Sequence, residues 1–244
     1  MSKKYDFWRL YMSKERENSI LEVLLSQKRA TVKELSEKLY ISPTSIRRDL
    51  ASLEKQNLIK RTHGGAMITD TIISSSKIPF MVREYEESKA KIEMAKKAIE
   101  LVNDNDVIFL DASTSAYNLI PFLVTKSNIV VITNSVRALS ALAQLNISTV
   151  STGGSLIASC MALVGEEAYK TIDSFKADVF FFSCRGISDD GELTDIHPSE
   201  NYVRAKMMAN SKRSYLLCAK NKFGKSYYHK LCNKDELDGV ITND

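Results

Sequence analysis

The spacing of apolar and polar residues predicts three helices in the first 60 residues of the chain. The first is expected at about residues 14–26, where apolar side chains recur at helical spacing. The second begins after Thr31, a favourable N-cap residue, and Glu34 three positions later completes a capping box. The third begins after Ser42, with Pro43 in its first turn, where proline is well tolerated.

The third helix is expected to have one apolar and one polar face. Ile46, Leu50 and Leu53 recur at positions i, i+4 and i+7, which places one face in a hydrophobic core. The other face, near the N-terminus of the helix, carries Thr44, Ser45, Arg47 and Arg48. This arrangement is typical of a helix-turn-helix, whose second helix presents its first residues to base edges of DNA. Arginine suits this role because it can donate two hydrogen bonds to guanine.

A short hairpin is predicted after the third helix. Extended segments within residues 58–68 flank the Gly64-Gly65 turn, a pattern expected for the wing of a winged helix-turn-helix. Positive charge or hydrogen-bond donors suited to phosphate come from Lys60, Arg61 and His63. The alternative is a three-helix packing unit with an incidental pair of arginines.

The remainder of the chain predicts an α/β fold. Residues 69–87 are rich in serine and then in charged residues, without sustained periodicity, and are interpreted as a linker. From residue 88 onward, short apolar runs alternate with helical patterns, which favours a parallel sheet covered by helices. Strands are expected at about residues 106–110, 129–133, 147–151, 178–183 and 215–219. Helices are expected at about residues 89–102, 135–145, 166–175 and 199–211, and after Ser115.

Turns rich in hydroxyl groups or glycine follow the first three of these strands. In chain order they contain Asp111, Ser113, Thr114 and Ser115, then Thr133, Asn134 and Ser135, then Gly153 and Gly154. Ligands of open parallel sheets bind beyond the carboxyl ends of the strands, where backbone amides and hydroxyl groups suit a phosphate. The same residue types also cap helices and form turns, so each motif alone is weak evidence.

Charge and composition narrow the function. Residues 1–70 carry 14 Lys and Arg against 9 Asp and Glu, a net charge of +5, whereas the remaining residues carry −1. A basic small domain beside a near-neutral larger one supports a nucleic-acid reader with a second function attached. The four cysteines and three histidines show no zinc-binding spacing, so no metal, cofactor or disulfide is expected. The chain has no apolar run of membrane-spanning length and no secretory signal, which favours the cytoplasm.

The sequence resembles the DeoR family of bacterial transcriptional regulators. The winged helix-turn-helix of that family is similar to VKELSEKLYISPTSIRRDLASLEKQNLIKRTHGGAMI. Its sensor domain, similar in fold to ribose-5-phosphate isomerase, is similar to DASTSAYNLIPFL, VVITNS, STGGSL, ADVFFFSCRGISDDGELTD and NKFG. The resemblance implies a DNA-binding domain at residues 13–68, a linker at 69–87 and an effector-sensing α/β domain at 88–244. Residues 1–11 are an extension beyond the family pattern.

The residue patterns and the resemblance together give the candidate site residues. The DNA-binding candidates are Thr31, Ser42, Thr44, Ser45, Arg47, Arg48, Arg61, His63, Gly64 and Gly65. The effector-binding candidates are Asp111, Ser113, Thr114, Ser115, Thr133, Asn134, Ser135, Gly153, Gly154, Arg185, Gly186 and Lys222. Arg185 stands where the family commonly has a smaller or uncharged residue, and we hypothesise that it adds a contact to a bound anion. Ser113, Ser115 and Ala219 also depart from the family pattern, which leaves the identity of the effector open.

Together these features predict a transcriptional regulator, most simply a repressor of a carbohydrate operon, whose affinity for operator DNA is changed by a phosphorylated sugar. Two DNA-reading heads are expected, which favours a homo-oligomer, either a dimer or a tetramer. Two alternatives stay open. One is an isomerase-like enzyme, with Asp111, Glu200 and Lys222 as acid–base candidates. The other is a constitutive DNA-binding protein with a vestigial sensor.

Overall fold

The chain forms two compact units, residues 1–88 and residues 89–244. The structure is a computed structural model, and it describes residues 16–68 except 18, 22, 25, 26 and 57, then residue 83 and residues 87–243. The expected N-terminal extension and most of the expected linker therefore lie outside the described residues. Among the described residues, no helix is long and apolar enough to cross a membrane.

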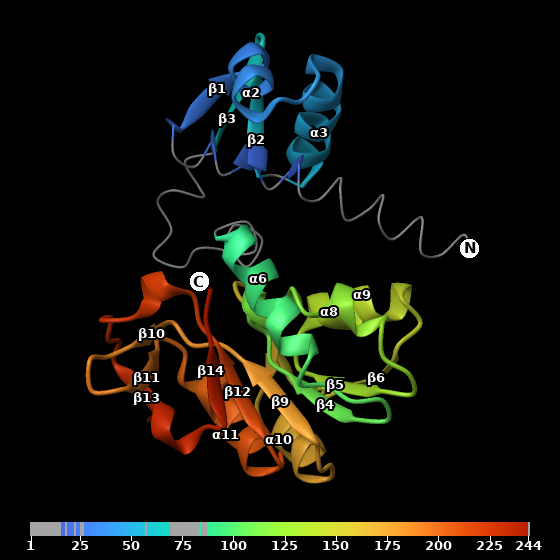
Figure 1. The fold of residues 1–244 in the computed structure, drawn as a ribbon, viewed down its shortest axis with the longest axis vertical. Coiled ribbons are helices and arrows are strands. Elements are labelled where there is room, and N and C mark those ends of the chain that lie inside the picture. Colours follow the sequence, from blue (N-terminus) through green and yellow to red (C-terminus); the bar gives the residue numbers. More distant parts are fainter. Residues whose placement is uncertain are drawn as a thin grey trace. The chain divides into compact units, whose positions relative to one another are not determined.

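The N-terminal unit combines helices with a small antiparallel sheet (Figure 1). Described residues between 16 and 24 are helical, as predicted for the first helix. The next elements are β1 (Arg29–Thr31), α2 (Val32–Leu39), α3 (Pro43–Lys55), β2 (Ile59–Thr62) and β3 (Gly65–Ile68). The strand order is β1-β3-β2, with both pairs antiparallel. The predicted hairpin is confirmed, and β1 is an additional strand that the sequence pattern did not predict.

Local signals begin α2 and α3 where the sequence predicts. The Glu34 amide donates to Thr31 Oγ1 at 3.1 Å, and the Thr31 amide donates to Glu34 Oε2 at 2.7 Å, so the capping box is complete. The Ser42 side chain accepts from the Ser45 amide at 3.3 Å, with Pro43 as the first helical residue. Between the helices, Tyr40 adopts a left-handed conformation with φ of 55°, which ends α2 and allows the sharp turn.

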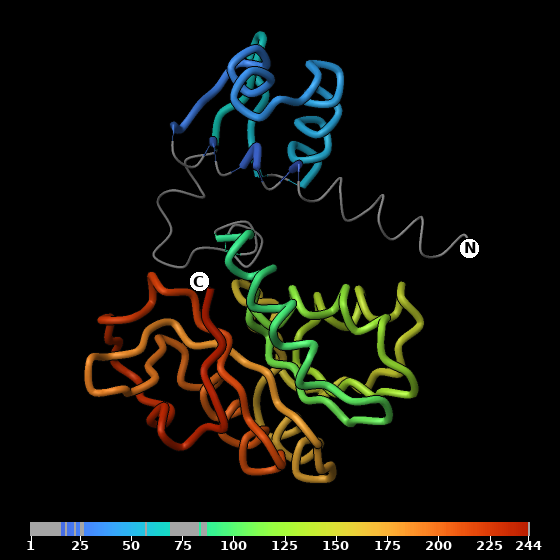
Figure 2. Tube along the Cα trace, in the orientation of Figure 1, coloured from blue at the N-terminus to red at the C-terminus, as the bar shows by residue number. Residues whose placement is uncertain are grey.

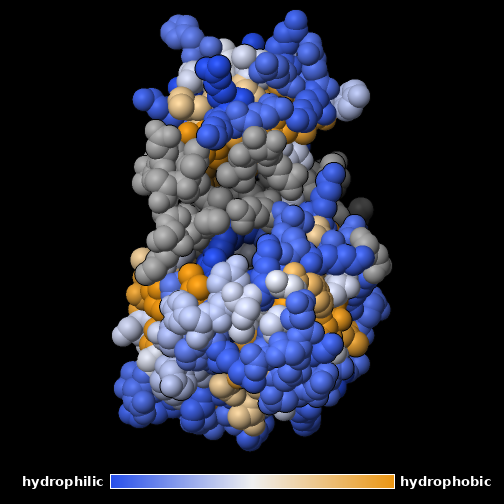
Figure 3. All heavy atoms as spheres, turned by 90° about the vertical axis from the view of Figure 1, so that its left-hand side faces the viewer, coloured by the Kyte–Doolittle hydropathy of each residue, from blue (hydrophilic) through white to orange (hydrophobic). Residues whose placement is uncertain are grey.

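The apolar face of α3 forms the core of this unit, as predicted. Buried apolar side chains come from the first helix and from each of β1, α2, α3, β2 and β3. The largest of those that are fully buried are Ile20, Leu24, Leu35, Ile46, Leu50, Leu53 and Ile68. A buried carboxylate, Asp49, lies among them and accepts two hydrogen bonds from Arg16, at 3.0 and 3.2 Å. The ion pair joins the first helix to α3. Hydrophilic residues dominate the face of this unit that is visible in Figure 3.

The C-terminal unit contains a parallel sheet of six strands, which confirms the predicted α/β fold. The strands are β4 (Val107–Leu110), β5 (Val130–Thr133), β6 (Ser148–Ser151), β9 (Val179–Phe182), β12 (Ser214–Leu217) and β14 (Gly239–Ile241). Their order is β14-β12-β9-β4-β5-β6. From central β4 the chain moves outward to β6 and then returns to β9 on the other side, as the trace in Figure 2 shows. The strand order therefore reverses between β4 and β9.

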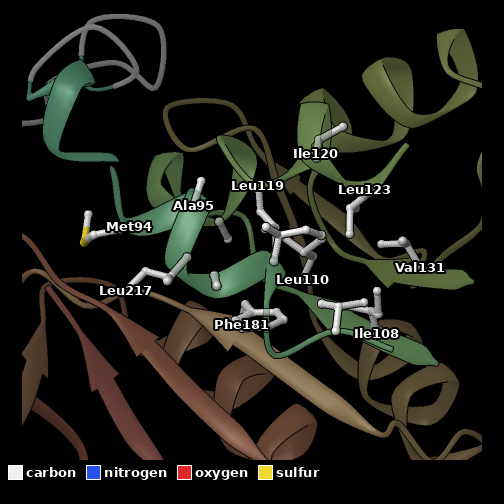
Figure 4. Packing of buried hydrophobic residues seen from close by; sticks show 14 of the residues in the cluster. Met94, Ala95, Ile108, Leu110, Leu119, Ile120, Leu123, Val131, Phe181 and Leu217 are labelled. Carbon is white, nitrogen blue, oxygen red and sulfur yellow. The ribbon is translucent and has the colours of Figure 1, made fainter. Parts of the chain in front are cut away.

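Alternate residues of the central strands pack against helices on opposite faces of this sheet. On one face lie α6 (Ser88–Ile99), α7 (Thr114–Tyr117), α8 (Ile120–Leu123) and α9 (Val136–Gln144). On the other lie α10 (Glu166–Asp173) and α11 (Pro198–Ala209). Figure 4 shows Ile108, Leu110 and Phe181 in the cluster beneath α6, whereas Phe109 and Phe180 join the cluster on the α11 face. The expected helix after Ser115 instead begins at Thr114 and is short.

Smaller sheets complete the unit, and the sequence pattern predicted none of them. One is the hairpin of β7 (Ser155–Ile157) and β8 (Ala162–Val164). The other contains β10 (Gly186–Ile187), β11 (Glu192–Asp195) and β13 (His229–Asn233), and its Leu193 and Cys232 pack in the same core as α11. Two 3-10 turns, Lys220–Lys222 and Lys234–Glu236, connect the last strands. These segments matter because they carry several residues of the candidate site.

Candidate functional site

The N-terminus of α3 presents polar side chains to solvent. Thr44, Arg47 and Arg48 are exposed, and Ser45 is half-buried because its hydroxyl contacts the Ser42 hydroxyl at 3.1 Å. Arg48 leans toward the buried Asp49, with 3.8 Å between Nε and Oδ1. Arg47 extends into a groove between α2, α3 and the hairpin turn, whose lining residues are Thr31, Val32, Lys33, Ser36, Glu37, Pro43, Arg47 and Gly64. This groove and the first turn of α3 form one polar surface.

The hairpin turn is tied to the start of α2. The Val32 amide donates to the Gly64 carbonyl at 2.7 Å, which brings the turn beside the N-terminal ends of both helices. Gly64 has a φ of +84°, a conformation that favours glycine, and open space surrounds its α-carbon. Gly65 serves a different purpose, because a β-carbon there would lie 2.2 Å from the Ala30 carbonyl oxygen of β1. The strand residues that flank the turn and are exposed to solvent are Lys60, Arg61, Thr62 and His63.

The DNA-binding candidates therefore divide into two groups. The side-chain oxygens of Thr31 and Ser42 cap helices, and Gly65 allows β1 and β3 to pair closely. The side chains available for outside contacts are Thr44, Arg47, Arg48, Arg61 and His63. Among them, Arg47 lines the groove that runs from the N-terminus of α3 to the Gly64 turn. A helix N-terminus beside a wing is the geometry of a winged helix-turn-helix.

In the C-terminal unit, Asp111 marks the point where the strand order reverses. It follows β4, and its amide donates to the Phe181 carbonyl of β9 at 3.2 Å. Its carboxylate accepts from the Ser113 amide at 3.0 Å and from the Ser183 amide at 3.4 Å. Ligands of doubly wound sheets bind at such a reversal, beyond the carboxyl ends of the strands. The side chain is only 2% exposed, so Asp111 holds the two strand ends together rather than facing solvent.

Arg204 of α11 is the centre of the buried polar network around Asp111. Its Nε donates to Asp111 Oδ2 and its Nη1 to Asp195 Oδ2, both at 2.9 Å, while Glu200 Oε1 lies 3.6 Å from Nη2. Burial alone would lower the pKa of Arg204, but the three carboxylates outweigh that effect and raise it. Burial likewise opposes ionisation of Asp195, yet the Arg204 charge leaves the pKa of Asp195 below its ordinary value. Arg204 and Asp195 are thus both charged at neutral pH.

Lys222 brings a cation to the same strand ends. Its Nζ donates to Ser183 Oγ and to the Cys184 carbonyl, both at 2.8 Å, from a 3-10 turn 38 residues later in the chain. The Ser183 hydroxyl in turn donates to the Leu217 carbonyl at the end of β12 at 2.6 Å. The structure therefore joins Lys222 to the ends of β9 and β12, one strand away from the Asp111 turn.

Two polar atoms at the neighbouring turns lack partners. Ser115 Oγ and Asn134 Oδ1 are buried and make no hydrogen bond within the part of the chain that the structure describes. A buried polar atom without a partner is costly, and such atoms are often satisfied by a ligand or water. The adjacent hydroxyls differ: Ser113 and Ser135 accept from the amides of Ala116 and Ala138 and so cap α7 and α9. Thr133 Oγ1 accepts from the Ser135 amide, whereas Thr114 is buried in the first turn of α7.

The remaining effector candidates lie around the switch point in different settings. Gly153 (φ +66°) faces open space, whereas a β-carbon on Gly154 would meet the Val164 carbonyl oxygen at 2.5 Å. At Gly186 a β-carbon would meet the Lys225 carbonyl oxygen at 2.4 Å. Arg185 stacks over the Tyr227 ring, with 5.7 Å from Cζ to the centroid, and its Nε lies 3.8 Å from Asp195 Oδ1. Its guanidinium is therefore already engaged within the protein.

Sequence reasoning missed Arg204, Asp195 and Ser183. A signal for the first of these was present, because Glu200 and Arg204 lie four residues apart on the same helical stripe as the buried Val203 and Met207. Charged residues on a core-facing stripe indicate a buried ion pair. Asp195 and Ser183 carried no comparable signal. Asp195 lies on β11, outside the helical stripe of its partner Arg204, and the shortest hydrogen bonds of Ser183 reach residues more than 30 positions away.

The fold and the two sites define a class of protein: a winged helix-turn-helix reader followed by a doubly wound α/β domain with a polar site at its switch point. Two family models match the chain, the DeoR-like helix-turn-helix domain at residues 16–71 and the DeoR C terminal sensor domain at residues 86–244. The chain belongs to the DeoR family of transcriptional regulators.

Relatives along nearly the whole chain agree with this assignment. An L-fucose operon activator of Haemophilus influenzae is 32% identical over 93% of this chain and 91% of its own length. An uncharacterized HTH-type transcriptional regulator of Bacillus subtilis, YulB, is 30% identical over 94% of this chain and 88% of its own. A glycerol-3-phosphate regulon repressor of Escherichia coli is 28% identical over 94% and 90%. The chain is therefore similar both to an activator and to a repressor.

Solved structures match only part of the chain, and more weakly. Ribose 5-phosphate isomerase A from Methanocaldococcus jannaschii is 18% identical, with a TM-score of 0.43 over 56% of this chain and 54% of its own. The eIF2B delta structure from Chaetomium thermophilum has a TM-score of 0.49, with 15% identity over 64% and 56%. Similarity of this extent carries no argument about function.

Proposed function

We propose that this regulator binds operator DNA of a carbohydrate operon through the first turn of α3 and the wing, and that a phosphorylated sugar changes its affinity for that DNA. The observation that carries the DNA-binding part is the shared surface of Arg47 and the Gly64 turn, which lie on one groove. A helix N-terminus and a basic hairpin on one surface suit base contact and phosphate contact respectively.

The effector part of the proposal rests on Lys222. Its ammonium group stands at the ends of β9 and β12, beside the reversal of strand order where ligands of such sheets bind. The unpartnered Ser115 Oγ and Asn134 Oδ1 supply further hydrogen-bonding capacity at the adjacent strand ends. In this proposal Lys222, Ser115, Asn134 and Gly153 are the groups available to a phosphate or sugar hydroxyl. Asp111, Ser113, Thr133 and Ser135 shape the turns through their internal hydrogen bonds.

The two sites act together through linkage. If DNA and effector prefer different arrangements of the protein, each weakens binding of the other by the same factor. Release of DNA by the effector corresponds to a repressor, and tighter DNA binding to an activator. A homo-oligomer is part of the proposal because two reading heads gain affinity and specificity from paired half-sites.

Enzymatic isomerisation is less well supported than regulation. An acid–base residue must reach the substrate and exchange protons with it. The two carboxylates considered for that role, Asp111 and Glu200, are almost fully buried and face Arg204. Asp111 thereby ties α11 to the end of β4, and Glu200 pairs with Arg204 within α11 itself.

Fluorescence anisotropy tests the proposal. The full chain is titrated against DNA from upstream of its own gene and neighbouring operon, at several salt concentrations, with and without a panel of sugar phosphates. We expect sequence-preferring binding that one phosphate changes at least about fivefold, within the usual range of allosteric coupling. Specific binding that no member of the panel changes would contradict the effector part, and absence of specific binding would contradict the operator assignment.

Two variants localise the effector site. Lys222→Met removes the cation and should abolish the response to the effector while leaving DNA affinity unchanged. Lys212→Met is the matched control, because this exposed lysine pairs with Asp178. An unchanged response in Lys222→Met would contradict the assigned site.

A further inference from the structure

Three side chains with metal-ligating atoms converge beside the Arg204 network. Cys160 lies between β7 and β8, His197 is the N-cap residue of α11, and Glu200 lies in the first turn of that helix. One ligand atom from each lies within 4.8 Å of the other two. Cys160 and Glu200 are 2% and 5% exposed, whereas His197 is half-buried, so the cluster opens toward solvent on one side only. The hairpin and the helix bring together residues that no sequence motif links.

The chemistry of these three groups fits zinc. Thiolate, imidazole and carboxylate are its usual protein ligands, at about 2.0–2.3 Å in tetrahedral geometry. Such bonds separate neighbouring ligand atoms by roughly 3.5 Å, so the side chains need to approach by about 1 Å. Sites with three protein ligands keep a fourth position open to water or to another molecule, unlike closed structural sites.

A divalent cation would also match the charge of its own ligands. Glu200 belongs to a buried network in which Asp111, Asp195 and Glu200 share the Arg204 guanidinium. Zn²⁺ bound by the Cys160 thiolate and the Glu200 carboxylate would offset the two negative charges of those ligands, which burial otherwise disfavours.

Neighbouring groups already position Glu200 and the start of α11, which carries two of the three ligands. Arg204 lies 2.9 Å from each of its two aspartates but 3.6 Å from Glu200, so the Glu200 carboxylate is oriented yet retains capacity for a metal. The His197 carbonyl accepts from the amides of Glu200 and Asn201 at 3.1 and 3.2 Å, which fixes the start of α11. Positioning of ligands by neighbouring groups is characteristic of metal sites.

The cluster borders the turns of the proposed effector site. Cys160 packs with Ala112 and Ala162, and Ala112 directly follows Asp111. Met161, which follows Cys160, accepts a hydrogen bond through its carbonyl from the Val136 amide of α9 at 3.0 Å. An ion held by Cys160 therefore lies close to the ends of β4 and β5.

We propose that Cys160, His197 and Glu200 bind one Zn²⁺, with the fourth position open to water or to an oxygen atom of the effector. The zinc site stands on the cluster alone, whereas the contact with an effector rests on the function proposed above. Zinc at this position would join the β7–β8 hairpin to α11 and complete one wall of the effector site.

Cobalt spectroscopy tests the zinc site. The full chain, without a histidine tag, is freed of metal and titrated with Co²⁺, which reports a thiolate ligand by near-ultraviolet charge-transfer absorption and tetrahedral geometry by its visible bands. We expect saturation at one equivalent and displacement by Zn²⁺. Cys160→Ser should abolish the charge-transfer band, and His197→Ala should weaken binding by about 100-fold or more, beyond the range typical of supporting residues. Absence of saturable binding would overturn the proposal.

Matched variants separate ligation from damage to the fold. Cys232→Ser alters another buried thiol, one whose pKa burial raises to about 12, and His229→Ala removes another half-buried imidazole. Both should keep the cobalt spectrum. A charge-transfer band that persists in Cys160→Ser, in protein with an unchanged thermal melt, would overturn the assignment. Repeating the sugar-phosphate panel with zinc-loaded and metal-free protein tests the effector contact separately. If no sugar phosphate changes DNA binding, the effector contact is contradicted, but the zinc site shown by the cobalt spectrum is not.

Discussion

The two units of this regulator hold their functional residues in opposite ways. The N-terminal unit presents Arg47, Arg48 and the wing on its surface, and short-range caps and a turn place them. In the C-terminal unit the central polar residues are buried, and partners such as Asp111 and Arg204 are 93 positions apart in the chain. A surface reading site tolerates local change, whereas a buried site depends on the whole packing around it.

The largest effect is expected when Arg204 is replaced by methionine. The three buried carboxylates would lose their shared cation, and loss of one partner from a buried ion pair costs about 3–5 kcal/mol. Calorimetry of the full chain should show this loss in the C-terminal unit. Lys206→Ala on the same helix is the control, since its pair with Asp173 is about half exposed and solvent screens it, so its loss should change stability little. Similar losses in the two variants would contradict the central role of Arg204.

Replacement of the two wing glycines by alanine should separate strand packing from turn geometry. Gly65→Ala forces a β-carbon against the Ala30 carbonyl oxygen and should destabilise the N-terminal unit by up to about 3 kcal/mol. The β-carbon added by Gly64→Ala would lie in open space. This variant should therefore lose only about 1 kcal/mol of stability, because alanine disfavours the left-handed backbone conformation. Hydrogen exchange of β1 and β3 measures both. Equal protection in the two variants would show that the close approach to β1 is unimportant.

Removal of the Arg47 side chain should weaken specific DNA binding without loss of stability. If this side chain reads a guanine, Arg47→Ala costs about 1–3 kcal/mol of binding free energy and relaxes preference at one base position. Lys55→Ala, at the other end of α3, is the control for loss of one positive charge. Anisotropy titrations at matched salt measure both variants. An equal, sequence-independent loss in the two would instead indicate general phosphate attraction.

The smallest effect is a change in acid sensitivity. The pKa of Asp195 is held below its ordinary value in the folded protein, so its contribution is complete above about pH 4 and is lost as the pH falls through the folded pKa. Asp195→Asn should lower stability at neutral pH and reduce the slope of stability against pH below about pH 4. Urea unfolding at several pH values measures both. Parallel pH profiles for the variant and the wild type would exclude this contribution.

Much of the fold was predictable because its signals are local. The capping box at Thr31, the proline after Ser42 and the apolar stripe of α3 each act within a few residues. The alternation of apolar runs with helices likewise predicted a parallel sheet. The strand β1 and the small sheet of β10, β11 and β13 escaped prediction, because these strands are short and gain their order from pairing with distant segments.

Local sequence accounts for the two-part organisation, the helix-turn-helix with its wing, and the turns that follow the first strands, since capping, periodicity and turn chemistry are properties of neighbouring residues. The fold, by contrast, decided which of those turns meet at the reversal of strand order. It also decided that Arg204 holds Asp111 and that Cys160 reaches His197 and Glu200. The physical reason is that strand order and helix packing bring residues together across the chain, and neither is encoded in the spacing of the residues that meet.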